Sequence, residues 1–132
     1  MYYIVKSSSG LLIKTQYDTQ TVSKGLLQFI NELMIEEYTT YEGRRKALKK
    51  KFNLKYNIPI YVHETCCFYT TKSIRDIETV CINYHKVLTI KKTSDNQTEV
   101  VFKDLHTLRV NTPYNKVKRK HVQTEKFLAL IQ

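Results

Sequence analysis

Residues 80–110 constrain the fold more than any other part of this sequence. Between residues 80 and 90 the even-numbered positions are apolar, with Lys86 as the exception, and the odd-numbered positions are mainly polar. This two-residue period is typical of a β-strand with one buried face and one solvated face. The polar stretch SDNQ at 94–97 then leads into EVVFK, and HTLRV follows after Asp104 and Leu105. Because short polar loops join neighbouring antiparallel strands, the segment predicts an antiparallel meander.

Further short strands are predicted before this meander. Apolar residues at 2–5 and 11–14 are separated by SSSG, whose serines and glycine suit a hairpin turn. Apolar residues at 60–62 and 66–69 favour two more strands, and TTKS at 70–73 favours a turn or loop.

Two helices are predicted from apolar spacing alone. In residues 22–38 the apolar positions recur at the spacing of one helix face. Residues 113–131 are expected to form the last helix, with Thr112 as N-cap and Pro113 at its first position.

A third helix is predicted between them from its end signals. Thr39 is followed three residues later by Glu42, the capping-box pattern in which hydroxyl and carboxylate satisfy the first-turn amides. The helix is expected to end near Phe52, with Asn53 as a left-handed C-cap, because Pro59 prevents continuation much further.

The length of 132 residues fits one domain over residues 1–132. We expect an α+β fold: an antiparallel β-sheet with an N-terminal hairpin and helices packed on it, and a C-terminal helix. No apolar run approaches the ~18 residues that span a membrane, and the N-terminus lacks the apolar core of a signal peptide. These features favour a cytoplasmic protein with no membrane partner.

Positive charge is concentrated in the middle helix. The chain has a formal net charge of +10, more than solubility requires, which indicates a polyanion as partner. No acidic residue occurs from residue 43 to residue 63. The basic residues there are Arg44, Arg45, Lys46, Lys49, Lys50, Lys51 and Lys55. Lysines neutralise phosphates, whereas arginines also contact base edges or enter a narrow minor groove. A solvated helix face with one-sided charge is the alternative interpretation.

Gly43 and a second basic group extend this candidate site. Gly43 in the first turn would let a sugar-phosphate backbone approach closely, although a local packing constraint is the alternative. The second group follows Tyr114 on the last helix and contains Lys116, Lys118, Arg119, Lys120 and His121. Two separate patches indicate a broad footprint or a dimer, and an ordinary solvated helix face is again the alternative.

Catalytic and metal-binding chemistry finds little support in the sequence. Cys66, Cys67 and Cys81 suit neither a disulfide framework nor a metal knuckle and are expected to be free, buried thiols. The histidines are scattered, and no HExxH, P-loop or GxSxG motif occurs. We therefore expect no enzyme activity, cofactor or metal. The ten tyrosines could stack on unpaired bases, so an RNA-binding or single-strand-binding module is the alternative function. A Mg²⁺-dependent nuclease is less favoured.

Four stretches of the chain resemble the ComK family, the competence transcription factors of Gram-positive bacteria, and occur in that family's order. They are YEGRRKA at 41–47, IPIYV at 58–62, FYTTKSIR at 68–75, and TEVVFKDLHTLRV followed by PYN at 113–115. The first stretch is the most specific of the four.

The resemblance implies an activator that binds A/T-rich double-stranded DNA through the minor groove and works as a homo-oligomer on DNA-uptake promoters. In such a protein Arg44 and Arg45 are the natural groove readers, and the lysines that follow contact phosphates. Arg75 is an additional contact or a structural salt-bridge donor. The remaining candidate DNA-binding residues are Tyr41, Gly43, Lys118, Arg119 and Lys120.

Overall fold

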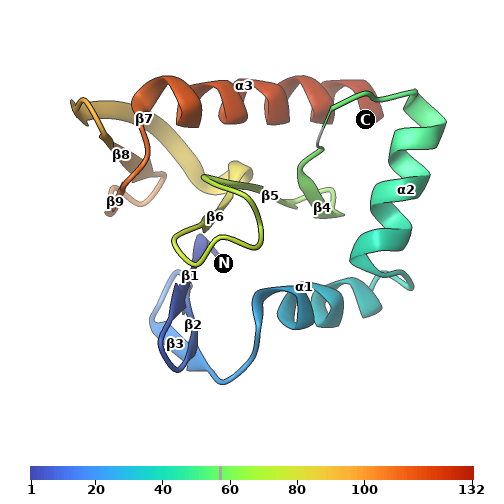
Figure 1. Cartoon of the computed structure of the whole chain (residues 1–132), viewed down its shortest axis with the longest axis horizontal. Coiled ribbons are helices and arrows are strands. Elements are labelled where there is room, and N and C mark those ends of the chain that lie inside the picture. Colours follow the sequence, from blue (N-terminus) through green and yellow to red (C-terminus); the bar gives the residue numbers. More distant parts are fainter. Residues whose placement is uncertain (57) are drawn as a thin grey trace.

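Two antiparallel sheets form the framework of the protein (Figure 1). The computed structural model describes residues 1–56 and 58–132. In spatial order, the strands of the large sheet are β3 (Thr19–Val22), β2 (Gly10–Lys14), β1 (Tyr3–Ser7), β6 (Val80–Asn83), β5 (Cys66–Thr70) and β4 (Ile60–His63). Those of the small sheet are β7 (Val87–Ser94), β8 (Gln97–Phe102) and β9 (Thr107–Val110). With helices packed on these sheets, the predicted α+β fold is confirmed.

The N-terminal hairpin forms as predicted. β1 and β2 pair from Tyr3 with Lys14 to Ser7 with Gly10, so the turn lies within SSSG. Gly10 has a φ of 139°, and a Cβ there would lie 2.1 Å from the Val22 carbonyl oxygen, so only glycine fits. β3 follows as an edge strand that the sequence pattern does not predict, because its mostly exposed residues TQTV show no apolar alternation.

α1 (Leu26–Ile35) packs on one face of the large sheet. Its buried residues Leu26, Ile30 and Met34 belong to a core cluster with Ile4 and Phe68 from the sheet. The helix predicted over 22–38 is too long at both ends. Its first residues belong to β3 and to the extended N-cap Gly25, and Tyr38 adopts a left-handed φ of 60°.

The single strand predicted over residues 80–90 is wrong. β6 ends in the large sheet, the 3-10 turn η1 (Tyr84–Lys86) redirects the chain, and β7 begins the small sheet. The buried side chain of Asn83 holds this corner, since it accepts from the His85 amide and donates to the Met1 carbonyl oxygen. Apolar periodicity does not reveal a corner whose two strands are both apolar.

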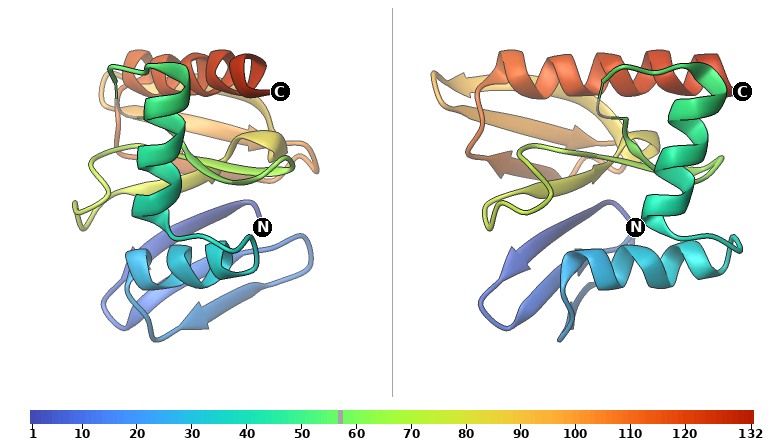
Figure 2. Two further views of the ribbon diagram at one scale, coloured as in Figure 1. Left: turned by 90° about the vertical axis from the view of Figure 1, so that its right-hand side faces the viewer. Right: turned by 45° about the vertical axis from the view of Figure 1, so that its right-hand side comes forward.

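The small sheet and α3 (Tyr114–Ile131) cover the opposite face of the large sheet (Figure 2). The predicted meander and the turn at 94–97 are confirmed, because β7 pairs with β8 and β8 pairs with β9. Val117 of α3 lies in a core cluster with Ile82, and Phe127 and Leu128 lie in a third cluster with Cys67.

The start of α3 differs from the prediction by one position. Pro113 is the N-cap rather than the first helical residue. Thr112 therefore does not cap the helix, and its carbonyl oxygen accepts a hydrogen bond from the Thr98 hydroxyl at 2.7 Å.

α2 (Tyr41–Phe52) crosses the β4 edge of the large sheet, between α1 and α3. In Figures 1 and 2 it runs from the end of α1 toward the level of α3. Tyr41 packs against the core cluster under α1, and Leu48 packs against the cluster under α3. The fold thus places the basic helix at an edge of the molecule, where it contacts both helical layers.

Candidate nucleic-acid interface

Local polar contacts fix both ends of α2. Thr40 is the N-cap, and its hydroxyl accepts a hydrogen bond from the Gly43 amide at 3.0 Å. The cap predicted at Thr39 is therefore wrong by one residue, because it is Thr40 whose extended backbone directs the hydroxyl at the first-turn amides. Asn53 has a φ of 53° and a ψ of 45°, so the predicted left-handed C-cap is confirmed.

Tyr41 and Gly43 both have structural roles in the first turn. The Tyr41 amide donates to Asn31 Oδ1 at 2.8 Å, which ties α2 to α1, and burial raises the pKa of the Tyr41 phenol. Gly43 is exposed, but a Cβ there would lie 3.0 Å from Thr40 Oγ1. This close approach favours the packing constraint as the reason for glycine.

The lysines of α2 and Lys55, which follows it, are not neutralised by neighbouring carboxylates among the described residues. Lys46, Lys50, Lys51 and Lys55 are exposed, and Lys49 is half-buried. Six ion pairs occur within the described residues, and none of them includes a lysine between residues 46 and 55. The charges in the last turn complement the helix dipole, so they are tolerated there without a counter-charge.

Arg44 lies against the edge strand rather than in solvent. Its Nη1 donates to the Val62 carbonyl oxygen at 2.7 Å and to the Tyr61 carbonyl oxygen at 3.4 Å. The guanidinium carbon also lies 5.5 Å from the centre of the Tyr61 ring. The pairing of β4 with β5 shifts register between Tyr61 and His63, so Arg44 satisfies carbonyl groups at a bulge in the edge strand.

Arg45 points along the other flank of α2. Its Nη2 lies 3.2 Å from Glu42 Oε2, and its side chain is 30% exposed. The Nε atom is buried and has no hydrogen-bond partner among the described residues. Arg45 is therefore only partly satisfied by the protein.

A cleft of about 210 Å³ lies beside Arg45. It is lined by residues from α2, from residues 58–60, from β5 and the loop after it, and from α3. The polar residues of its lining are Tyr41, Arg45, Tyr69, Thr70, Ser73, Lys120, Gln123 and Thr124. The cleft thus joins four segments that lie apart in the sequence: the stretches at 41–47, 58–62 and 68–75, and the basic group of the last helix.

Lys120 is the second cation of this cleft. Burial lowers the pKa of its ammonium group, and the neighbouring positive charge of Arg119 lowers it further. The Thr124 hydroxyl donates to the Lys120 carbonyl oxygen at 2.8 Å. Among the described residues, the Lys120 ammonium group takes part in none of the six ion pairs. The cleft contains two cations, and its lining includes no carboxylate among the described residues.

The groove on the opposite flank of α2 has a mixed charge. It measures about 920 Å³ and is lined by Arg44 and Lys51 together with Glu37 and Glu64. Acidic side chains there repel a polyanion. The cleft beside Arg45 therefore favours an anionic ligand, whereas the groove on the other flank of α2 does not.

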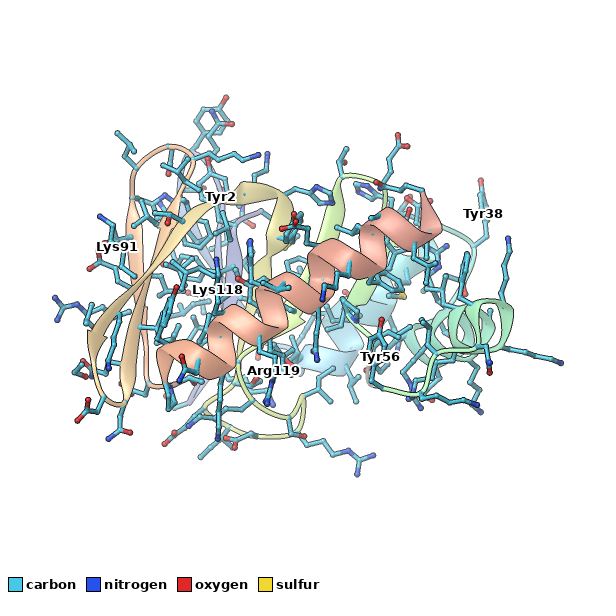
Figure 3. All side chains as sticks on the ribbon, turned by 90° about the horizontal axis from the view of Figure 1, so that it is seen from above. Tyr2, Tyr38, Tyr56, Lys91, Lys118 and Arg119 are labelled. Atoms are coloured by element: carbon cyan, nitrogen blue, oxygen red, sulfur yellow. The ribbon has the colours of Figure 1, made fainter. Side chains whose placement is uncertain are left out.

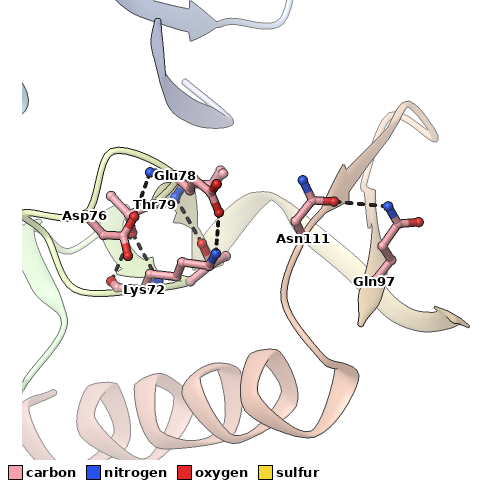
Figure 4. A network of polar contacts seen from close by, with 8 residues as sticks. Lys72, Asp76, Glu78, Thr79, Gln97 and Asn111 are labelled. Atoms are coloured by element: carbon pink, nitrogen blue, oxygen red, sulfur yellow. Dashed lines mark hydrogen bonds and ion pairs between the residues drawn. The ribbon is translucent and has the colours of Figure 1, made fainter. Parts of the chain in front are cut away.

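The loop at 71–79 between β5 and β6 is held by a dense polar network (Figure 4). Lys72 Nζ lies 2.6 Å from Glu78 Oε2, and the Thr79 hydroxyl donates to the Lys72 carbonyl oxygen at 2.9 Å. Asp76 Oδ1 accepts from the Glu78 amide at 2.8 Å. Arg75 is exposed and makes no ion pair within the described part of the chain, so the role of a structural salt-bridge donor finds no support.

The basic group of α3 is divided over several sides of the helix. Lys118 and Arg119 are exposed and extend in different directions (Figure 3), whereas Lys120 is half-buried in the cleft. His121 Nδ1 lies 3.2 Å from the Tyr69 hydroxyl, and burial lowers the pKa of the imidazole. His121 therefore belongs to the core side of the helix.

The exposed tyrosines and the cysteines lie outside the lining of the cleft beside Arg45. The exposed tyrosines Tyr17, Tyr38 and Tyr56 come from three different connections between elements. The three cysteines are free and buried, as predicted, and burial raises the pKa of Cys66 to about 11. Within residues 1–56 and 58–132 no group of three or more side chains is placed to hold a metal ion. In the same residues, none of the helices has the length and apolar character needed to cross a bilayer.

Sequence reasoning found Arg45 and Lys120 but missed Ser73, Gln123 and Thr124. These neutral residues carry no charge or motif signal of their own, and only the fold brings them together.

A family model described as ComK protein matches residues 4–132, nearly the whole chain. Neither the curated proteins nor the solved structures contain a match.

Proposed function

This chain belongs to the ComK family of competence-related transcription factors, and on that premise we propose that it binds A/T-rich double-stranded DNA through phosphates and the minor groove. The observation that carries this proposal is the group of lysines on α2 and just after it, which are exposed except for the half-buried Lys49 and make no ion pair within the described residues. The phosphates of a DNA duplex are regularly spaced negative charges that can neutralise these lysines. Lys46, Lys49, Lys50, Lys51 and Lys55 are the phosphate contacts in this proposal.

Arg75 takes the role of groove reader in this proposal. An arginine enters a narrow, A/T-rich minor groove because the negative potential is strongest there. Arg44 is tied to the carbonyl groups of β4, and Arg45 faces the cleft, so neither guanidinium projects from the outer face of α2. The exposed Arg75 on a loop held by Lys72, Glu78 and Thr79 fits the role better.

We propose that residues 1–132 act as a single DNA-binding unit and that the protein works as a homo-oligomer. The pairing of β1 with β6 supports the first statement, because it joins the N-terminal hairpin to the later strands in one sheet. The separation of the α2 lysines from Lys118 and Arg119 supports the second, because one short site does not reach all of these charges.

Fluorescence anisotropy tests the proposal with three probes of equal length: an A-tract duplex, a G/C-rich duplex and the single strand of the A-tract. We expect the A-tract duplex to bind most tightly and a minor-groove drug to compete for it. Tighter binding of the single strand would favour an RNA-binding or single-strand-binding module instead. A lack of competition would refute the minor-groove assignment. Cleavage of the duplex only with added Mg²⁺ would indicate a nuclease.

The salt dependence of binding tests the role of the lysines. The double variant Lys46→Gln, Lys50→Gln should lower the slope of log affinity against log salt by about 2, since each phosphate contact contributes about 0.9. The control variant Lys91→Gln, Lys92→Gln removes the same charge from β7, on the opposite side of the molecule from α2 (Figure 3), and should leave the slope unchanged. Equal losses in both variants would show a non-specific charge effect.

A further inference from the structure

The cleft beside Arg45 concentrates positive charge in a partly buried place. Arg45 reaches it from α2 and Lys120 reaches it from α3. Glu42 Oε2 lies 3.2 Å from Arg45 Nη2 and is the one carboxylate paired with these two cations among the described residues. A protein normally surrounds half-buried cations with carboxylates, because desolvated charge without a partner is costly. The charge of this cleft is therefore only partly compensated by the protein.

Two further observations indicate that the cleft favours an anionic ligand. Arg45 Nε is a buried donor without a partner among the described residues, and such donors are rare in folded proteins. Burial and the charge of Arg119 both lower the pKa of Lys120, so a negative group beside its ammonium would relieve an unfavourable environment.

Neutral donors and cleft size narrow the choice of anion. Hydroxyl groups of Thr70 and Ser73 and the amide of Gln123 line the same space. The volume of about 210 Å³ is smaller than the roughly 300–1,000 Å³ of a typical small-molecule site. The apolar part of the lining includes the half-buried Pro59 and Ile74, which suit the carbon atoms of a sugar. Together these features match one phosphate group attached to a sugar.

We propose that this cleft binds a single phosphodiester group of the DNA backbone, with Arg45 and Lys120 as its charged contacts and Thr70, Ser73 and Gln123 as neutral donors. The inference rests on the proposed DNA binding and deepens it. It makes Arg45 a phosphate contact instead of a groove reader. It also assigns Lys120 a binding role that its half-buried position in α3 would not suggest.

The first experiment titrates the full chain with inorganic phosphate at constant ionic strength and follows amide and arginine side-chain signals by NMR. We expect saturable shifts of the Arg45 Nε–H signal and of the Thr70 and Ser73 amides, and no comparable shifts with chloride. The absence of saturable shifts at these groups would overturn the inference.

Matched variants assign the phosphate to the cleft. Lys120→Gln should abolish the phosphate shifts and lower the salt slope of duplex binding by about 0.9. Gln123→Glu leaves both cations in place but introduces a carboxylate, and it should also abolish the shifts. The control Lys126→Gln removes an exposed charge from α3 outside the cleft and should change neither result. Because Gln123→Glu adds no cavity, it keeps the test valid if Lys120→Gln fails to fold.

The outcomes separate this inference from the proposed function. If the native chain binds the duplex and Lys120→Gln retains the full salt slope, the cleft does not contact the backbone and the inference fails while the proposed function stands. If phosphate binds but Lys120→Gln does not affect duplex affinity, the assignment to DNA is wrong. If the native chain binds no duplex, the proposed function itself fails.

Discussion

α1 and α2 are neighbouring helices, but different kinds of interaction hold them against the rest of the protein. α1 has three buried apolar residues, Leu26, Ile30 and Met34, and no side-chain hydrogen bond at its N-cap. α2 has no fully buried residue, but it has a hydroxyl cap at Thr40 and a left-handed cap at Asn53. Burial therefore fixes α1, whereas specific polar contacts fix α2.

This difference shows how the fold accommodates a helix with so much unopposed charge. An apolar stripe wide enough to anchor α2 would leave little surface for lysines. The Arg44 contacts with β4 and the Tyr41 amide bond to Asn31 hold the helix with few residues. The outer face of α2 is then free to carry positive charge.

The largest expected effect is loss of core packing under α1. Ile30→Ala removes a side chain with 0% exposure and should lower the free energy of unfolding by about 2–5 kcal/mol. The matched variant Leu48→Ala in α2 removes a half-buried side chain and should cost clearly less. Urea unfolding measures both values. Equal costs would contradict the contrast between the two helices.

The next effect concerns the polar anchor of α2. Arg44→Ala leaves the Tyr61 and Val62 carbonyl groups without their charged donor and should lower the free energy of unfolding by about 1.5–3 kcal/mol. Chemical denaturation measures the loss.

A second readout distinguishes an anchor from a DNA contact. In the folded Arg44→Ala protein the salt slope of duplex binding should equal that of the native chain. Arg44→Lys keeps the charge but not the planar fork and should recover only part of the stability. A reduced salt slope with unchanged stability would show that Arg44 contacts phosphate instead.

A smaller loss of stability is expected when the N-cap of α2 is removed. Thr40→Ala removes the hydroxyl that accepts from the Gly43 amide and should cost about 0.5–2 kcal/mol, measured by thermal or urea unfolding. Thr39→Ala is the control, because the Thr39 hydroxyl donates weakly to the Thr40 carbonyl oxygen at 3.4 Å and makes no cap bond. A larger loss in the free energy of unfolding for Thr39→Ala would show that Thr39 is the N-cap, as the sequence predicted.

The elements that could be predicted from sequence are those with local signals. The first hairpin, α2, its Asn53 cap and the meander follow from turn residues, capping residues and periodicity. The corner at η1 could not be predicted, because Asn83 holds it through a hydrogen bond to the distant Met1 carbonyl group. β3 has no apolar pattern because it is an exposed edge strand.

The candidate site shows the same division between local and long-range information. Charge alone identified the basic residues of α2 and α3 in the sequence. The separate roles of Arg44 and Arg45 depend on contacts with β4 and with the cleft, which are formed by residues far away in the chain. Adjacent arginines in a helix point about 100° apart, so their sequence similarity does not imply a common role.

The smallest effect on stability is expected for the outer lysines of α2. Lys50→Gln removes a favourable contact with the helix dipole but also relieves repulsion from Lys46 one turn earlier, so the two terms oppose each other. For Lys50→Gln the free energy of unfolding should therefore change by less than about 0.5 kcal/mol, as measured by urea unfolding. Duplex affinity should nevertheless fall and its salt slope should drop by about 0.9, whereas folded Ile30→Ala should keep the native salt slope. If Lys50→Gln instead destabilises the protein by more than about 1 kcal/mol, the lysine has a structural partner. The charge on α2 would then serve the fold, and the contrast with α1 would no longer support DNA binding.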